Sequence, residues 1–110
     1  MKWNNGDMSV RKNNWSIEWD SNEQQRFKEI IKDTKERSEN LAQRLKDKVR
    51  ENLNHIKQNP YIFEVDSLKN NNDGSFRKFT AIHIRVVYKI DSDKIIIARV
   101  RHAASEPKEY

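Results

Sequence analysis

Cationic side chains that could bind phosphate are concentrated in residues 67–102 of this 110-residue chain. The segment holds eight lysines and arginines against three aspartates, so it carries the whole net charge of +5. The basic residues are Lys69, Arg77, Lys78, Arg85, Lys89, Lys94, Arg99 and Arg101. Arginine binds phosphate oxygens through paired hydrogen bonds, so such a cluster is typical of a nucleic-acid-binding site. The alternatives are a solvated sheet face that discourages edge pairing and a surface for an acidic protein.

Several other kinds of chemistry are excluded by composition. The chain has no cysteine, which excludes disulfides, cysteine-bound zinc and a thiol nucleophile. His55 and His83 lie at no metal-ligand spacing, so we expect them to be structural or surface groups and expect no metal or other cofactor. The longest apolar run, residues 95–98, is far shorter than the roughly 20 residues of a membrane helix. We therefore expect a cytoplasmic protein that does not enter a membrane.

The length predicts one domain, and the first residues are expected to lie outside it. Residues 1–13 (MKWNNGDMSVRKN) show no periodicity and read as a flexible leader, in which Met8 is an alternative start. The domain is expected over residues 14–110. Only 35% of the residues of the whole chain are hydrophobic, so local patterning must carry much of the fold.

The first half of the domain predicts a strand and two helices. Residues 15–19 alternate apolar and polar side chains, as a half-buried strand requires. Asp20, Ser21 and Asn22 supply helix-capping side chains, and Gln24 follows Ser21 at the spacing of a capping box, so the first helix is expected to start here. Ser38 is the expected cap of the second helix. The second helix carries a stripe of Leu41, Leu45, Val49, Leu53 and Ile56. Pro60 predicts that it stops near Gln58.

The second half predicts three strands separated by turns at residues 70–74 and 91–93. In the middle strand, Ile84, Val86, Tyr88 and Ile90 share one face. In the last strand, Ile96, Ala98 and Val100 are expected on the apolar face and Arg99 and Arg101 on the basic one. The sequence thus predicts an α+β fold in the order β-α-α-β-β-β, with a two-helix hairpin packed on one face of an antiparallel sheet.

This order of elements carries a recognisable set of motifs. An NP dipeptide ends the second helix, and RKF, IRVVYKID and DKIIIARVRHAASEP follow it. The set resembles the RelE/ParE toxins of bacterial type II toxin–antitoxin systems over residues 15–110, most specifically over 77–102. The resemblance implies a RelE-like fold and a cognate antitoxin that keeps the toxin silent.

The family divides into two activities that share one fold. RelE-like members cut messenger RNA on the ribosome without a metal, and ParE-like members poison DNA gyrase. We expect the ribosome-dependent endoribonuclease, with mRNA and the ribosome as partners. The gyrase poison and a non-catalytic nucleic-acid-binding module are the alternatives.

The ribonuclease reading assigns a role to each candidate residue, since RNA cleavage by the 2′-hydroxyl needs a base, a cation and an acid. Arg85 matches the family's arginine and would stabilise the transition state. Asp66 resembles the base of YoeB-like members, although a turn or capping role is the alternative, and His102 and Tyr110 resemble C-terminal catalytic groups. Phosphate contacts are expected from Lys69, Arg77, Lys78, Lys89, Arg99 and Arg101. The strand alternation puts His102 with Val100, away from Arg101.

Overall fold

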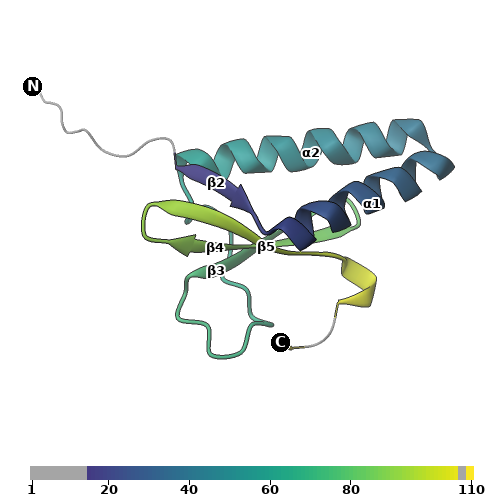
Figure 1. Ribbon diagram of the computed structural model, residues 1–110. Helices are drawn as coiled ribbons and strands as arrows, with labels where there is room; N and C mark the ends of the chain where they lie inside the picture. Colours follow the sequence, from purple (N-terminus) through teal and green to yellow (C-terminus); the bar gives the residue numbers. More distant parts are fainter. Residues whose placement is uncertain (1–14, 107–108) are drawn as a thin grey trace, which may run out of the picture.

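The computed structural model describes residues 15–106 and 109–110, and the predicted leader lies outside them. The elements are β2 (Ser16–Trp19), α1 (Ser21–Arg37), α2 (Glu39–Gln58), β3 (Phe76–Ala81), β4 (Ile84–Asp91), β5 (Lys94–His102) and a 3-10 turn, η1 (Ala103–Ser105). The predicted β-α-α-β-β-β order and α+β class are therefore confirmed. Figure 1 shows both helices on one side of the sheet, with the loop after α2 and the C-terminus on the other side.

The sheet is mixed rather than purely antiparallel. Its strand order is β2-β5-β4-β3, and β2 pairs with β5 in parallel while the other pairs are antiparallel. A tight turn can join only antiparallel neighbours, whereas the long path through two helices lets β2 return beside the last strand in the parallel direction. The alternation of residues 15–19 could not distinguish these two directions.

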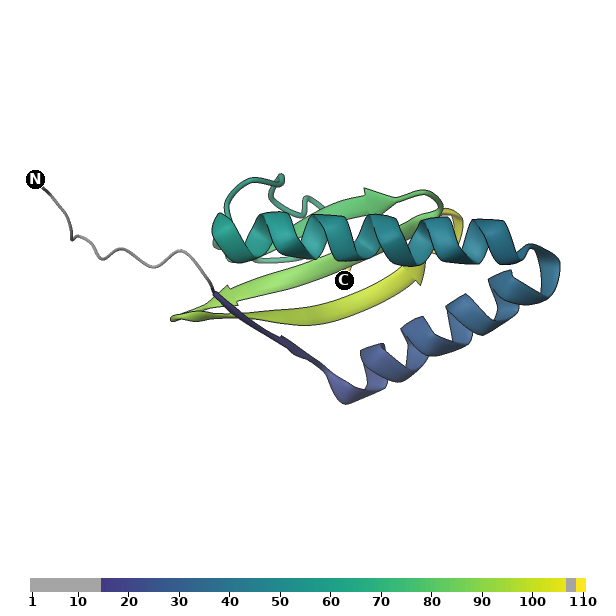
Figure 2. The same ribbon diagram turned by 90° about the horizontal axis from the view of Figure 1, so that it is seen from above.

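The helices begin and end close to the predicted positions, with one change at the first cap. Asp20, not Ser21, caps α1, because its carboxylate accepts hydrogen bonds from the N–H groups of Asn22 and Glu23. The Ser21–Gln24 capping box is therefore wrong. Ser38 caps α2 as predicted, with its hydroxyl accepting from the N–H of Leu41 at 3.1 Å. The two helices form a hairpin whose closed end projects past the strands (Figure 2).

The core lies between this hairpin and one face of the sheet. Ile30 from α1 and Leu45, Val49 and Ile56 from α2 pack on it. The sheet supplies Phe79, Ala81, Ile84, Val86, Tyr88, Ile90, Ile95, Ile97 and Val100. The predicted apolar face of β4 is confirmed. The hydroxyl of Tyr88 is satisfied within the core by the backbone oxygen of Pro60, at 2.7 Å.

A bulge at Ala98 changes which side chains of β5 face the core. Val87 pairs with Arg99 and Tyr88 pairs with Ile97, so Ala98 has no partner across the strand. Without the extra residue, the odd-numbered positions 95, 97, 99 and 101 would share one face. The bulge instead turns Ile95 and Ile97 into the core, so the prediction that Ile96 and Ala98 lie there is wrong, whereas that for Val100 is right.

Candidate functional site: a closed arginine–carboxylate cluster

The face of the sheet away from the helices, here called the distal face, carries Arg85, Val87 and Lys89 on β4 opposite Arg101, Arg99 and Ile96 on β5. It is covered by the loop of residues 59–75 and by the end of the chain (Figure 1). The side chain of Arg85 is consequently only 8% exposed to solvent. The predicted basic face exists, but its central arginine does not face solvent.

Asp66 lies beneath this cover and is completely buried. Its carboxylate accepts hydrogen bonds from Arg85, from the Tyr110 hydroxyl and from the N–H of Leu68. Burial alone would raise the pKa of Asp66, but these hydrogen bonds, led by those of Tyr110 and Arg85, outweigh it and hold the pKa below its usual value. Asp66 is therefore an ionised partner of the arginine.

The loop places Asp66 through its own backbone bonds. The backbone N–H of Asp66 donates to the backbone oxygen of Phe76 at 2.9 Å, and the side-chain NH₂ of Asn72 donates to the backbone oxygen of Asp66 at 2.9 Å. The side-chain oxygen of Asn72, Oδ1, accepts hydrogen bonds from the backbone N–H groups of Gly74 and Phe76, which fixes the predicted turn. Asp66 thus has the turn role that the sequence offered as the alternative to a catalytic base, and its carboxylate also binds Arg85.

Glu106 is the residue that the sequence analysis missed. One carboxylate oxygen accepts from Arg99 Nε at 2.7 Å, and the other accepts from Arg85 at 3.3 Å. Its side chain is 3% exposed, so the two arginines and the two acids, Asp66 and Glu106, neutralise one another out of water. The sequence shows the two acids of the tail, Glu106 and Glu109, but two arginines on one face need nearby anions only when that face is covered, and the cover appears only in the structure.

Tyr110 closes the cluster. Its N–H donates to the Leu68 oxygen at 2.9 Å and its own oxygen accepts from the N–H of Asn70 at 2.6 Å, as in a strand pair. The ring lies 4.4 Å below the guanidinium carbon of Arg99. Burial first, and then the hydrogen bond to the Asp66 carboxylate, raise the pKa of Tyr110, so its hydroxyl stays protonated.

The other predicted phosphate-binding residues mostly have protein partners. Arg77 donates to the backbone oxygens of Gly74 and Phe63, and Lys78 pairs with Glu64 at 3.1 Å. Arg101 binds Glu23, the third residue of α1, at 2.6 Å. Lys69 and Lys89 lie over the ring of Phe76, at 5.0 and 5.6 Å. Most of the positive charge of the distal face is thus engaged within the molecule.

His102 does not join the cluster. It pairs with Ile84 at the end of β5, and its ring stacks on His83 with 5.5 Å between centroids. It also lines a hollow with Arg26, Glu29, Ile30 and Asp33 of α1, on the helix side of the sheet. Burial and the charge of His102 lower the pKa of His83. The structure therefore brings Asp66, Arg85 and Tyr110 together and leaves His102 on the opposite side.

Within the described residues, no group of three or more His, Asp or Glu side chains could hold a metal ion. Among those residues there is also no helix with the length and apolar character to cross a membrane.

Comparison with known proteins identifies the family of this chain. None of the curated proteins matches the chain. A family model described as the ParE toxin of the type II toxin–antitoxin system parDE matches residues 17–107, which span both helices, the sheet and Glu106. The chain therefore belongs to the RelE/ParE toxins of type II toxin–antitoxin systems, whose toxins are paired with a cognate antitoxin.

Proposed function

We propose that this toxin arrests growth by binding DNA gyrase, as ParE-like toxins do, rather than by cutting messenger RNA. The observation that carries the proposal is the burial of Arg85 and Asp66 in a neutral cluster closed by Glu106 and Tyr110. The matched family description, which names ParE, supports the same choice. This target also implies a cytoplasmic location.

RNA cleavage by the ribose 2′-hydroxyl makes demands that the cluster does not meet. The base must have a free lone pair near the substrate, and the stabilising cation must have free donors. The carboxylate of Asp66 is occupied by Arg85 and Tyr110, and its lowered pKa makes it a weaker base. Because the Tyr110 hydroxyl stays protonated and its hydrogen bond is donated to Asp66, it is not a free acid or base.

His102 stands apart from this cluster, at the end of β5, where its ring stacks on His83. It faces the α1 side of the sheet, so it cannot act on a phosphate held by Arg85 on the distal face. The contacts of Arg85 with Asp66 and Glu106 are better explained as a buried ionic network that fastens the loop and the tail to the sheet.

The endoribonuclease remains the second candidate, because one observation favours it. Glu106 places two oxygens on Arg85 and Arg99, which is how a phosphate group would bind two arginines. Asp66 and Tyr110 lie beside that position. A tail that left the distal face would expose an arginine pair with a carboxylate and a phenol next to it.

Two assays of the purified toxin separate the candidates. In the first, gyrase and supercoiled plasmid are incubated with the toxin and then denatured, so that a trapped enzyme leaves linear DNA. In the second, a translating extract is tested for transcript cleavage in EDTA. The proposal expects linear DNA and intact transcripts. Transcript cleavage that is lost in Tyr110→Phe, without linear DNA in the first assay, would instead establish the ribonuclease. The His102→Gln variant serves as a matched control and is expected to trap gyrase normally.

A further inference from the structure

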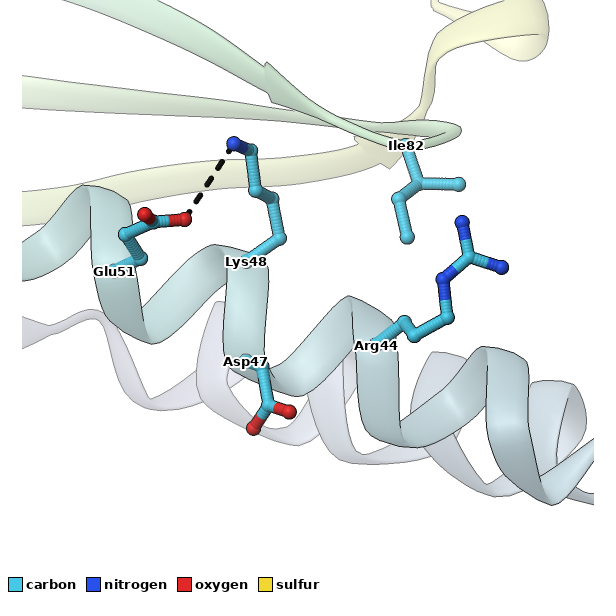
Figure 3. A pocket seen from close by; sticks show the side chains of 5 residues that line it. All are labelled: Arg44, Asp47, Lys48, Glu51 and Ile82. Carbon is cyan, nitrogen blue, oxygen red and sulfur yellow. Dashed lines mark hydrogen bonds and ion pairs between the residues drawn. The ribbon is translucent and has the colours of Figure 1, made fainter.

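A groove of about 380 Å³ separates the middle of α2 from the turn between β3 and β4 (Figure 3). Its lining consists of Arg44, Asp47, Lys48 and Glu51 from the helix and Ile82 from the turn. None of these residues belongs to the closed cluster on the distal face. The groove therefore needs its own explanation.

Ile82 is an unusual choice for this turn. It is 42% exposed and its backbone has a φ of +56°, in the left-handed region that β-branched residues rarely adopt. Asn or Gly would fit that backbone with less strain. A strained residue that also exposes a large apolar side chain is typical of a contact site, since the fold itself gains nothing from it.

The charged residues of the groove leave one cation without compensation. Lys48 pairs with Glu51 at 3.4 Å, and Asp47 accepts from Gln43 and Arg50. Arg44 has no hydrogen bond or ion pair to any residue in ranges 15–106 and 109–110. Figure 3 shows its guanidinium beside the side chain of Ile82. The groove thus offers an apolar anchor next to a free positive charge.

The outer edge of β3 is free close to the same turn. Glu64 and Asp66 cover its first half, since the Lys78 N–H donates to the Glu64 oxygen and the Asp66 N–H donates to the Phe76 oxygen. The backbone alternation makes Thr80 the next residue whose N–H and oxygen point outward. Within the described part of the chain, both groups of Thr80 lack a hydrogen-bond partner. An extended chain could add there as a further strand.

We propose that an extended, acidic segment of the cognate antitoxin binds here. It pairs with the backbone of Thr80, packs an aliphatic side chain on Ile82 and places a carboxylate on Arg44. The acidic character follows from the unpaired Arg44 and from the net charge of +5. The inference depends on membership of the toxin–antitoxin family and not on which target the toxin poisons.

The test uses a fluorescent synthetic decapeptide that alternates valine and glutamate, and anisotropy as the measure of binding. We expect saturable binding to the full chain, and none by the matching valine–lysine peptide. Arg44→Glu should weaken binding by about tenfold or more, since it replaces an ion pair with a repulsion. Lys46→Glu is the matched control, because it makes the same charge change at an exposed position of α2 outside the groove.

Two further variants address the backbone and the anchor. Thr80→Pro removes the edge N–H and should abolish binding. Ile82→Asn should leave the thermal midpoint of unfolding unchanged or raise it, because it relieves the backbone strain of the turn. The same variant should still weaken peptide binding at least about fivefold, because it removes the apolar anchor. Absence of saturable binding, or equal losses in Arg44→Glu and Lys46→Glu, would overturn the proposal. These outcomes are independent of the gyrase and transcript assays.

Discussion

Replacing Arg85 by methionine should destabilise the toxin strongly, because the closed cluster would lose its central cation. Asp66 is completely buried and would keep only the Tyr110 hydroxyl and the Leu68 N–H as partners. Breaking a buried ion pair in this way costs about 3–5 kcal/mol. That is a large share of the roughly 5–15 kcal/mol that stabilises an ordinary domain.

Urea denaturation measures this loss. With a slope of about 2 kcal/mol/M, a loss of about 4 kcal/mol lowers the urea midpoint by about 2 M. The double variant Arg85→Met/Asp66→Leu should be more stable than Arg85→Met alone, since no charge is left unpaired on Asp66. Arg50→Met is the control, because Arg50 forms only an exposed pair with Asp47 and should change stability by no more than about 0.5 kcal/mol.

A small loss of stability in Arg85→Met would contradict a closed cluster. If Arg85→Met costs less than about 1 kcal/mol, the guanidinium is hydrated in solution and the tail does not close over it. The observation that supports gyrase binding over RNA cleavage would then be lost, and Arg85 would be available to a phosphate.

Other expectations concern single residues. Burial raises the pKa of Tyr88 to about 12, so its stabilisation is complete below the unfolded pKa of about 10 and declines as the pH rises toward about 12. Urea titrations at about pH 9 and 11 measure the free energy of unfolding, and its decrease between these pH values should be smaller in Tyr88→Phe than in the wild type. An equal decrease in the two proteins would assign the pH dependence to Tyr110 alone. Glu106→Gln should cost about 1–3 kcal/mol and speed proteolytic trimming of the tail, because two buried arginines lose an anion; wild-type trimming rates would contradict the closed tail. Leu45→Ala should cost about 2–5 kcal/mol in the same unfolding assay, as Leu45 is fully buried beneath the sheet. Asp20→Ala should cost about 1 kcal/mol by loss of the α1 cap, whereas Ser21→Ala should be nearly neutral; the reverse ranking would restore the predicted capping box.

The elements of the fold were predictable because their signals are local. Helix caps, the Leu45–Ile56 stripe and the alternation in β4 all depend on residues a few positions apart. The bulge at Ala98 was not predictable, because it depends on what lies opposite in β4. Alternation continued through that residue therefore assigned Ile96 to the wrong face.

The candidate site was predicted in part for a similar reason. The resemblance singled out Asp66, Arg85 and Tyr110, which the fold brings together from a loop, a strand and the end of the chain. It gave no indication that Glu106 would complete the charge balance, or that the tail would cover the sheet. Sequence reveals the types of charged groups but not their burial.

By itself, the sequence determined the class of fold and the two layers, because hydrophobic period and turn chemistry act over short distances. Its motifs also carried the resemblance to the family. Only the tertiary structure decided whether the basic face is open. Its arginines could have met solvent, a nucleic acid or the chain's own acids. Which of these they meet depends on where residues 59–75, Glu106 and Tyr110 lie. Long-range pairing of charges follows from packing in three dimensions, which no spacing along the chain encodes.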